Sequence, residues 1–169
     1  FVAVAIFTGL GQGVQPLISK YYGMKKWELV KKVKRYALLT AMSIALLIYV
    51  GTFAYADTLI SLFNNENDLA IVQLADKGIK IYFLGFFFVG INIVTAMFLS
   101  ATEKARAAFI ISILRGLVVI VPLAIVFSNM WQMTGIWSAF VLSELIVSGF
   151  ALYVANAIEK ENLAYGNLE

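Results

Sequence analysis

Residues 36–56 have the sequence YALLTAMSIALLIYVGTFAYA, in which no side chain carries a charge. An α-helix needs about 20 mainly apolar residues to cross a hydrocarbon core of roughly 30 Å. A spanning β-strand needs only about 9–11 residues, and its polar and apolar side chains alternate. Because this run is long and does not alternate, it predicts a transmembrane α-helix.

Four further stretches have the same character, although two of them are interrupted by charged residues. Arg106 and Arg115 lie in the fourth stretch of the chain, and Glu144 lies in the fifth. The expected spans are about 1–19, 36–57, 80–102, 105–128 and 131–158. We therefore expect an all-α fold, a polytopic membrane helix bundle with about five transmembrane helices.

The two ends of the chain indicate a part of a larger protein. Phe1 has no methionine before it and already stands inside an apolar run, which favours a start within a transmembrane helix. Residues 159–169 are expected to form a cytoplasmic tail. Its last residues, Asn167–Glu169, are either native or the remnant of a cloning site.

The composition supports a membrane protein and excludes several kinds of chemistry. The chain is 62% hydrophobic and 14% charged, with a mean hydropathy of +0.87, whereas soluble domains carry about 25% charged residues. It has no cysteine and no histidine, which excludes disulfides, a Ser-His-Asp triad and zinc ligation by these residues. We therefore expect no metal, no cofactor and no enzymatic activity, because an intramembrane enzyme would need catalytic groups from outside this chain.

The charges of the connecting segments alternate along the chain. Residues 20–35 are strongly basic, residues 57–80 are mainly acidic, and residues 102–106 are again basic. Because basic loops stay inside, we expect loops 20–35 and 102–106 and the C-terminus to be cytoplasmic, in a multi-pass protein of the cell (plasma) membrane. Trp131 and Trp137 then lie at the outer interface of the bilayer. The net charge of +3 arises from the basic segment, so it indicates orientation, and we expect no nucleic-acid partner.

Two connecting segments have a helical pattern of their own. Residues 27–36 place apolar side chains among lysines, which is typical of a short amphipathic helix on an anionic membrane surface. A solvated linker that merely sets the orientation is the alternative. In the acidic connection, residues 64–68 offer N-cap side chains and predict a helix that leads into the third span.

Five groups of short motifs, in order along the chain, resemble those of the multidrug and toxic compound extrusion (MATE) family. They are GLGQGVQPLIS (9–19) with YGMKK (22–26), LF (62–63) with ND (67–68), FLGFFFVGIN (83–92) with SATEKA (100–105), LRG (114–116) and GIW (135–137). The chain is therefore similar to a C-terminal part of a MATE transporter over nearly its whole length.

This resemblance implies a twelve-helix transporter with two six-helix lobes around a central cavity. Residues 1–158 would supply part of helix 8 and helices 9–12 of the C-terminal lobe, and the N-terminal lobe of the same polypeptide would complete the cavity. Members of the family export small amphipathic cations in exchange for protons or sodium ions by alternating access. The alternative is a lipid-linked saccharide flippase of the same superfamily, for which a more strongly cationic cavity is expected.

Two positions depart from the family pattern. Lys20 and Tyr21 stand where many relatives have Tyr-Asn. The sodium-coupled branch has an aspartate in its tenth helix, and the corresponding position falls near Val89 or Gly90. The resemblance therefore favours protons over sodium ions as the coupling ion.

Glu144 and Arg115 are the ion-coupling candidates, because both lie near the middle of an expected span. A charge at mid-bilayer costs about 2.5–3.5 kcal/mol on insertion scales, so an ionisable residue at that depth is a functional candidate. One interpretation is that the two residues pair, or bond neighbouring helices, and simply fix the packing. The other makes Glu144 a group that binds and releases a proton, with its charge coupled to a cationic substrate.

Uncharged polar residues and one proline are candidates for a cavity wall or a hinge. Gln12 and Gln15 share a helical face, as do Asn92 and Thr95, because each pair is three residues apart. Such groups either form hydrogen bonds between helices, each of which stabilises the packing by about 0.6 kcal/mol, or they line a wet cavity. Pro16 removes one helical hydrogen bond and predicts a bend, which is either static or a hinge for alternating access.

Overall fold

The structure of the chain, a computed structural model, describes residues 1–63 and 69–166. Its helices, in chain order, are α1 (Val2–Gly23), α2 (Trp27–Ala54), α3 (Ala56–Phe63), α4 (Leu69–Leu84), α5 (Phe86–Ala101), α6 (Ala105–Ile113), the π-helical turn η1 (Leu114–Val118) and α7 (Ile120–Gly166). No strand occurs in these two ranges of the chain. The expected all-α fold is confirmed.

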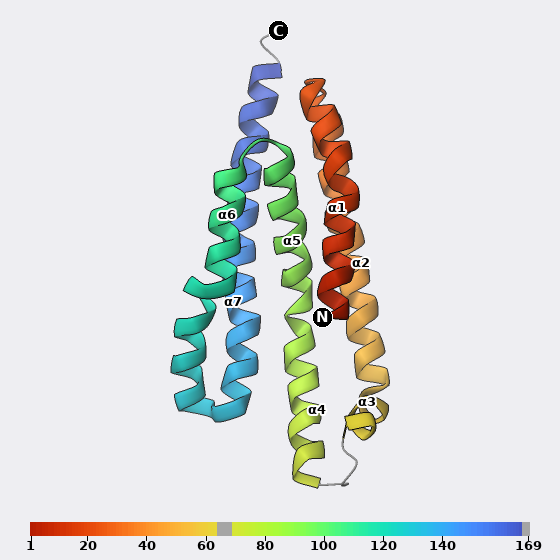
Figure 1. Ribbon diagram of the computed structural model, residues 1–169, viewed down its shortest axis with the longest axis vertical. Helices are drawn as coiled ribbons and strands as arrows, with labels where there is room; N and C mark the ends of the chain where they lie inside the picture. Colours follow the sequence, from red (N-terminus) through yellow and green to blue (C-terminus); the bar gives the residue numbers. More distant parts are fainter. Residues whose placement is uncertain (64–68, 167–169) are drawn as a thin grey trace.

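Four helical stretches are long and apolar enough to cross a membrane: Val2–Gly23, Trp27–Ala54, Ile71–Ala101 and Ala105–Asn162. The last stretch consists of two antiparallel legs, which form the hairpin of α6, η1 and α7 at the left of Figure 1. The chain reverses at Trp131 and Gln132, whose φ and ψ angles are −132° and 15°, and 51° and −129°. Together these stretches supply five legs, in agreement with about five expected spans.

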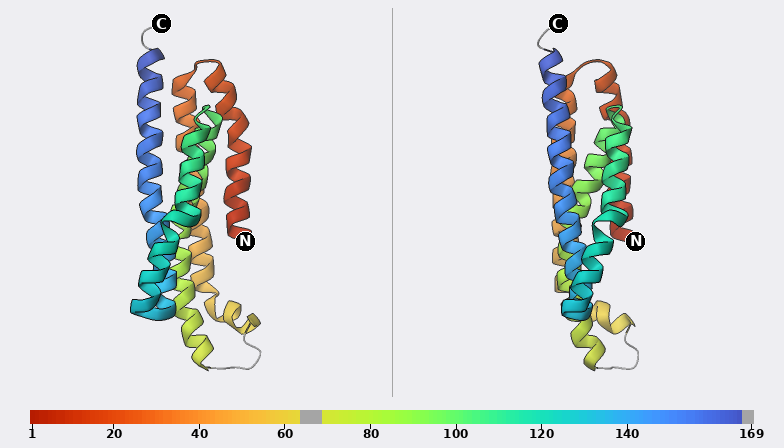
Figure 2. Two further views of the ribbon diagram at one scale, coloured as in Figure 1. Left: turned by 60° about the vertical axis from the view of Figure 1, so that its left-hand side comes forward. Right: turned by 90° about the vertical axis from the view of Figure 1, so that its left-hand side faces the viewer.

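α5 is the central helix of the bundle. It packs against α1, α2, α6 and α7, with the α1–α2 pair on one side and the α6–α7 hairpin on the other (Figure 1). α4 extends the line of α5 toward the lower end, where the short helix α3 projects sideways (Figure 2). The α1–α2 turn, the α5–α6 turn and the C-terminal end of α7 all lie at the upper end (Figures 1 and 2), as the expected topology requires.

Small side chains allow α2 to lie close to α5. Ala37, Ala41 and Ala45 follow one another at intervals of four residues and are all buried. They belong to an apolar cluster with Phe7 of α1 and with residues of α5. Inside a membrane, helices associate through such close packing, because lipid tails are as apolar as the side chains that they would replace.

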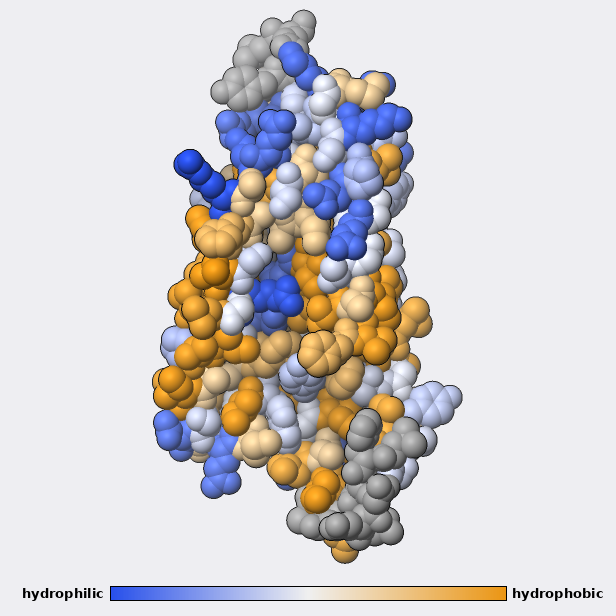
Figure 3. All heavy atoms as spheres, in the orientation of Figure 1, coloured by the Kyte–Doolittle hydropathy of each residue, from blue (hydrophilic) through white to orange (hydrophobic). Residues whose placement is uncertain are grey.

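The outer surface of the bundle has the polarity that a bilayer requires. Figure 3 shows a broad apolar belt across the middle of the face in view, with hydrophilic side chains gathered above and below it. Large apolar side chains such as Leu47, Phe109 and Ile125 are exposed. In water a surface of this kind would drive association, whereas lipid tails cover it without cost.

Two sequence expectations change in detail. The basic segment 27–36 is helical, but it is the beginning of the long helix α2 and not a separate element. α7 continues to Gly166, so residues 159–166 of the expected tail extend the helix of the last span. Pro16 lies inside α1, and the bend expected there stays a prediction. The expected N-cap residues 64–68 and the final residues 167–169 lie outside the described residues.

Three turns between antiparallel helices each contain a residue with a positive φ angle. They are Lys25 (55°), Glu103 (63°) and Gln132 (51°). The last turn is also tight, because a side chain at Gly135 would collide with the main chain of Phe127. Glycine at this position therefore allows the two legs of the α7 hairpin to lie together.

Candidate functional site

Three polar side chains from three elements meet in the apolar interior; we call Asn92, Arg115 and Glu144 the polar centre. Asn92 comes from α5, Arg115 from η1 and Glu144 from the second leg of α7. The side chain of Glu144 is 3% exposed and that of Arg115 is 25% exposed. Asn92 is 1% exposed. The structure therefore brings together the two charged residues that interrupt the apolar spans, and it adds an amide.

The carboxylate of Glu144 is bound on both of its oxygens. Arg115 Nε donates to Oε1 at 2.7 Å, and Asn92 Nδ2 donates to Oε2 at 2.7 Å. The same amide nitrogen lies 3.0 Å from the main-chain carbonyl oxygen of Glu144. Because hydrogen bonds to ionised groups are stronger than neutral ones, these contacts offset part of the cost of placing a carboxylate at this depth.

A local irregularity of the backbone carries the arginine. η1 is a π-helical turn, in which Val119 N donates to Leu114 O at 3.0 Å, five residues back. Such turns are rare and occur often at functional sites, because the extra residue changes which side chains face inward. Arg115 lies within this turn and reaches Glu144 on the facing leg of the hairpin.

The polar centre is not fully sealed. Arg115 is partly exposed, and Figure 3 shows a hydrophilic spot within the apolar belt, between the α6–α7 hairpin and α5. Asn92 Oδ1 and Thr95 Oγ1 are buried without a hydrogen-bond partner in the described part of the chain. This arrangement combines one carboxylate, one guanidinium and two free oxygens, which is enough to bind or release a proton or to hold small polar ligands.

The other expected site residues lie apart from these contacts. Gln12 and Pro16 are exposed on α1 and Gln15 is half-buried. Within residues 1–63 and 69–166, no hydrogen bond joins either glutamine to the polar centre. Thr95 is buried on α5 together with Asn92, as their spacing predicts.

Val89 and Gly90, near which the sequence analysis places the aspartate of the sodium-coupled branch, are themselves uncharged and lie in an apolar environment. Val89 is 1% exposed. A Cβ atom at Gly90 would lie only 2.9 Å from the ring of Phe7. Among the described residues, no group of three or more histidine, cysteine, aspartate or glutamate side chains could hold a metal ion. The structure therefore offers no carboxylate-rich cation site at this point of α5.

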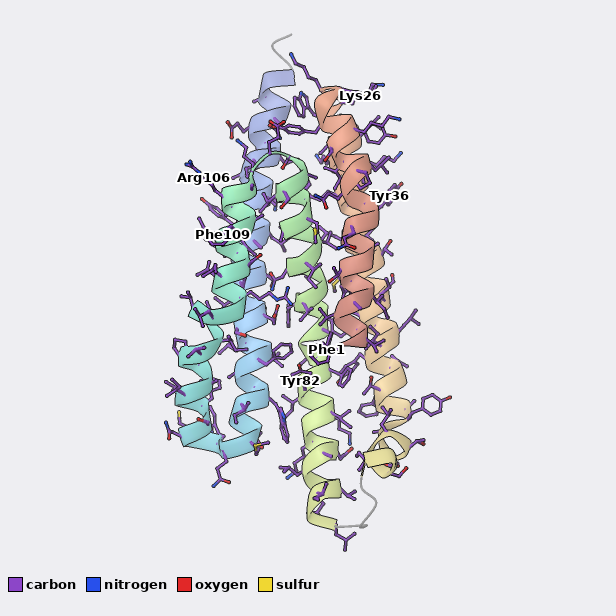
Figure 4. The ribbon with its side chains drawn as sticks, viewed as in Figure 1. Phe1, Lys26, Tyr36, Tyr82, Arg106 and Phe109 are labelled. Atoms are coloured by element: carbon purple, nitrogen blue, oxygen red, sulfur yellow. The ribbon has the colours of Figure 1, made fainter. Side chains whose placement is uncertain are left out.

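An aromatic layer lies on the α4 side of the polar centre. The ring of Tyr82 stacks on Phe140, with 4.4 Å between the ring centres, and it also contacts Phe86 edge-on at 5.7 Å. Tyr82 lies near the end of α4, in the middle of the bundle (Figure 4), and its ring faces α7 through Phe140. These contacts fix the register of α7 against α4 and α5, and hence the height at which Glu144 meets Asn92.

A second buried ion pair near the upper end was missed by the sequence analysis. Lys34 is only 6% exposed; its ammonium group pairs with Glu159 and donates to Asn156 Oδ1 at 3.1 Å. It also lies 5.1 Å from the centre of the Phe98 ring. The available signal was the spacing of Lys34 from Ala37 and Ala41, which places all three residues on one buried face of α2.

Comparison with known proteins identifies the family. A family model described as MatE matches residues 1–126. The chain is 32% identical over 149 residues to a Staphylococcus saprophyticus protein named multidrug export protein MepA, a match that covers 88% of this chain and 32% of that protein. A Staphylococcus aureus protein of the same name is 30% identical over 150 residues, with the same coverage. The chain thus spans about a third of the length of these curated relatives.

Solved structures of related proteins show the same fold. The inward-facing conformation of a multidrug resistance MATE family transporter of the MOP superfamily superimposes with a TM-score of 0.90 at 16% identity, covering 96% of this chain and 38% of that one. The bent form of the Vibrio cholerae MATE transporter VcmN gives 0.84 at 20% identity, covering 99% and 37%. The MatE family model matches residues 1–126, which are about three quarters of this chain. This chain therefore belongs to the MATE (MatE) family.

Proposed function

We propose that the protein to which this chain belongs is a secondary active multidrug exporter. It exchanges small amphipathic cations for protons, or for sodium ions, by alternating access. The observation that carries the proposal is the 32% identity to a protein named multidrug export protein MepA over 88% of the chain. The match of the MatE family model to residues 1–126 supports it.

In this proposal Glu144 is the ion-coupling residue and Arg115 is its partner. A proton that binds Glu144 removes most of the attraction across the 2.7 Å contact with Arg115 Nε. Loss of this attraction loosens η1 from the second leg of α7, and loss of the proton restores it. The partial exposure of Arg115 and the irregular backbone of η1 support a contact that opens and closes. The alternative is that the pair only fixes the packing of the hairpin.

The remaining polar residues have supporting roles in this proposal. Asn92 and Thr95 line a wet part of the cavity, which their two buried oxygens without partners support. Gln12 and Gln15 face the cavity that the N-terminal lobe of the same polypeptide completes, and Pro16 gives α1 the freedom of a hinge. Residues 1–158 form part of the C-terminal lobe in a cell membrane, with loops 20–35 and 102–106 and the C-terminus in the cytoplasm.

Transport by the intact protein in proteoliposomes tests the function. We expect a fluorescent cationic dye to be extruded when an inward-directed proton gradient is imposed. A sodium gradient is imposed separately, and the effective ion identifies the coupling. If neither gradient moves the dye and a lipid-linked saccharide is translocated instead, the exporter proposal is wrong and the flippase is favoured.

Two variants test the role of the carboxylate in the same assay. Glu144→Gln keeps the size of the side chain and one acceptor oxygen but removes the titrating group, so we expect proton-driven extrusion to be strongly impaired. Glu161→Gln is the matched control, because Glu161 is exposed near the C-terminal end of α7. If Glu144→Gln leaves the rate and its pH dependence unchanged, the carboxylate has only a packing role.

A further inference from the structure

The exposed side of the N-terminal turns of α2 carries a basic hollow that the proposed transport function does not use. The hollow has a volume of about 470 Å³, within the range of roughly 300–1,000 Å³ of ligand pockets. It is lined by Glu28, Leu29, Lys31, Lys32, Arg35, Tyr36 and Leu39. Three cations and one carboxylate give it a net charge of +2, which favours an anion.

The three basic side chains of the hollow, Lys31, Lys32 and Arg35, make few ionic contacts with other described residues. Lys32 Nζ lies 5.9 Å from the centre of the Tyr36 ring, and no ion pair of Lys32 or Arg35 occurs there. Lys31 Nζ lies 3.8 Å from Glu159, but Glu159 is already paired with the buried Lys34. These three side chains therefore keep donors for an external ligand.

An apolar stripe begins where the hollow ends. Leu39 belongs to the hollow itself, and Met42, Leu46 and Val50 follow it along α2 at intervals of three or four residues, which places them on one side of the helix. All four side chains are exposed. A ligand that fits both parts has an anionic head and a long apolar tail.

The hollow also lies at the correct height for such a ligand. Tyr36 and Lys26, which lie on either side of the basic residues along the chain, are found near the upper right edge of the bundle (Figure 4). Figure 3 shows hydrophilic side chains at this end, directly above the apolar belt. The hollow is therefore at the boundary between the headgroups and the hydrocarbon core, where a lipid places its phosphate.

We propose that this hollow binds an anionic phospholipid, such as phosphatidylglycerol. The phosphate accepts hydrogen bonds from Lys31, Lys32 and Arg35, and the acyl chains lie along Leu39, Met42 and Leu46. Clusters of basic residues at the end of a transmembrane helix attract anionic headgroups in this way. A soluble phosphate would use the cations but leave the apolar stripe empty, and the stripe therefore favours the lipid.

Native mass spectrometry of the purified intact protein tests the proposal. The protein is titrated with phosphatidylglycerol and, in parallel, with phosphatidylcholine. We expect the triple variant K31Q/K32Q/R35Q to bind the first phosphatidylglycerol about tenfold more weakly than the native protein, because three headgroup contacts are lost. Phosphatidylcholine binding should be weaker at the outset and should change little in the variant.

A control variant with the same loss of charge distinguishes binding of the lipid in the hollow from a general attraction of anionic lipids to the basic end of the bundle. K20Q/K104Q/R106Q removes three basic residues from other positions at the same end of the bundle, and its phosphatidylglycerol binding should stay within about twofold of native. An equal loss in both triple variants would overturn the proposal. So would displacement of the lipid by millimolar glycerol phosphate, because the site would then be one for a soluble anion.

A second pair of variants guards against misfolding of the triple variant. K31R/K32R keeps the charges and should keep phosphatidylglycerol binding within about twofold of native, whereas Leu39→Asn keeps the cations and should weaken it by severalfold through the acyl chains. Thermal unfolding of each variant in detergent verifies that the fold is retained. Unchanged lipid binding in the folded triple variant, or in Leu39→Asn, would contradict the proposed site.

Discussion

Asn92 Nδ2 lies within hydrogen-bonding distance of two oxygens of Glu144, its carboxylate Oε2 at 2.7 Å and its main-chain carbonyl at 3.0 Å. The amide therefore holds both the side chain and the backbone of a residue that lies 52 positions away in the sequence. This relationship ties the centre of α5 to the second leg of α7. It also leaves Asn92 Oδ1 as a buried acceptor without a partner among the described residues.

Replacing the amide should destabilise the intact protein. We expect Asn92→Leu to lower the free energy of unfolding by about 1–3 kcal/mol, because the carboxylate and the carbonyl of Glu144 lose a donor in a buried place. The measurement is the unfolding of the purified protein in detergent with increasing sodium dodecyl sulfate.

Thr95→Val is the matched control for this prediction. Thr95 is buried on the same face of α5, but its hydroxyl has no hydrogen-bond partner in the described part of the chain. We expect the variant to be close to neutral, since no hydrogen bond to another described residue is lost. A loss as large as that of Asn92→Leu would show that the hydroxyl has a partner that the structure does not contain.

The ion pair between Arg115 and Glu144 should show strong thermodynamic coupling. Arg115→Gln leaves a carboxylate that is 3% exposed without its cation, which costs about 3–5 kcal/mol. Glu144→Gln leaves an arginine that reaches the surface, so its cost should be smaller, about 1–2 kcal/mol. The double variant should be more stable than the sum of the two losses predicts, by about 1–3 kcal/mol. Additive losses would mean that the two charges do not interact in the folded protein.

The approximate number and order of the transmembrane helices follow from the sequence, because the length of an uncharged run and the thickness of a bilayer leave little choice. Their ends do not, since α2 begins at Trp27 and the third stretch at Ile71, well before the expected starts at 36 and 80. Arg115 and Glu144 were also identified, since a charge inside an apolar run is costly and therefore conspicuous. Their contact depends on the π-helical turn at 114–118. This turn adds one residue to the helical repeat and so changes which side chains point toward the facing leg. Nothing in the sequence at these positions predicts that turn.

Lys34 illustrates a different limit of the sequence analysis. It belongs to the basic segment 20–35, which was interpreted as a signal of orientation, and one lysine of such a segment is not distinguished by composition. The structure buries it because α2 is continuous from Trp27 to Ala54, so the buried face of the span extends into the basic turns. The partner, Glu159, lies in the segment that is expected to be a cytoplasmic tail, and no local pattern connects the two residues.

The Lys34–Glu159 pair should stabilise the contact between α2 and α7. We expect Lys34→Met to destabilise the intact protein by about 1–3 kcal/mol, because Glu159, which is largely shielded from water, then keeps only the more distant and exposed Lys31, at 3.8 Å. Methionine keeps a long apolar side chain at this position, so the loss reflects the charge that lies 5.1 Å from the centre of the Phe98 ring. Lys32→Met is the control, since Lys32 is exposed and should change the unfolding free energy by less than about 0.5 kcal/mol. Lys34→Met combined with Glu159→Gln should recover part of the loss, and a failure to do so would argue against the pair.

The turn between α5 and α6 carries backbone strain that glycine would relieve. Glu103 has a φ of 63°, a conformation that costs roughly 1–2 kcal/mol for a residue with a side chain and nothing for glycine. After allowing for the greater freedom of glycine in the unfolded chain, we expect Glu103→Gly to stabilise the protein by about 0.5–1 kcal/mol.

The same replacement at Glu161, on the exposed helical end of α7, should destabilise the protein by about 1 kcal/mol. Thermal unfolding of both variants checks this difference in sign, and a loss of stability at Glu103 would mean that its side chain makes contacts worth more than the strain.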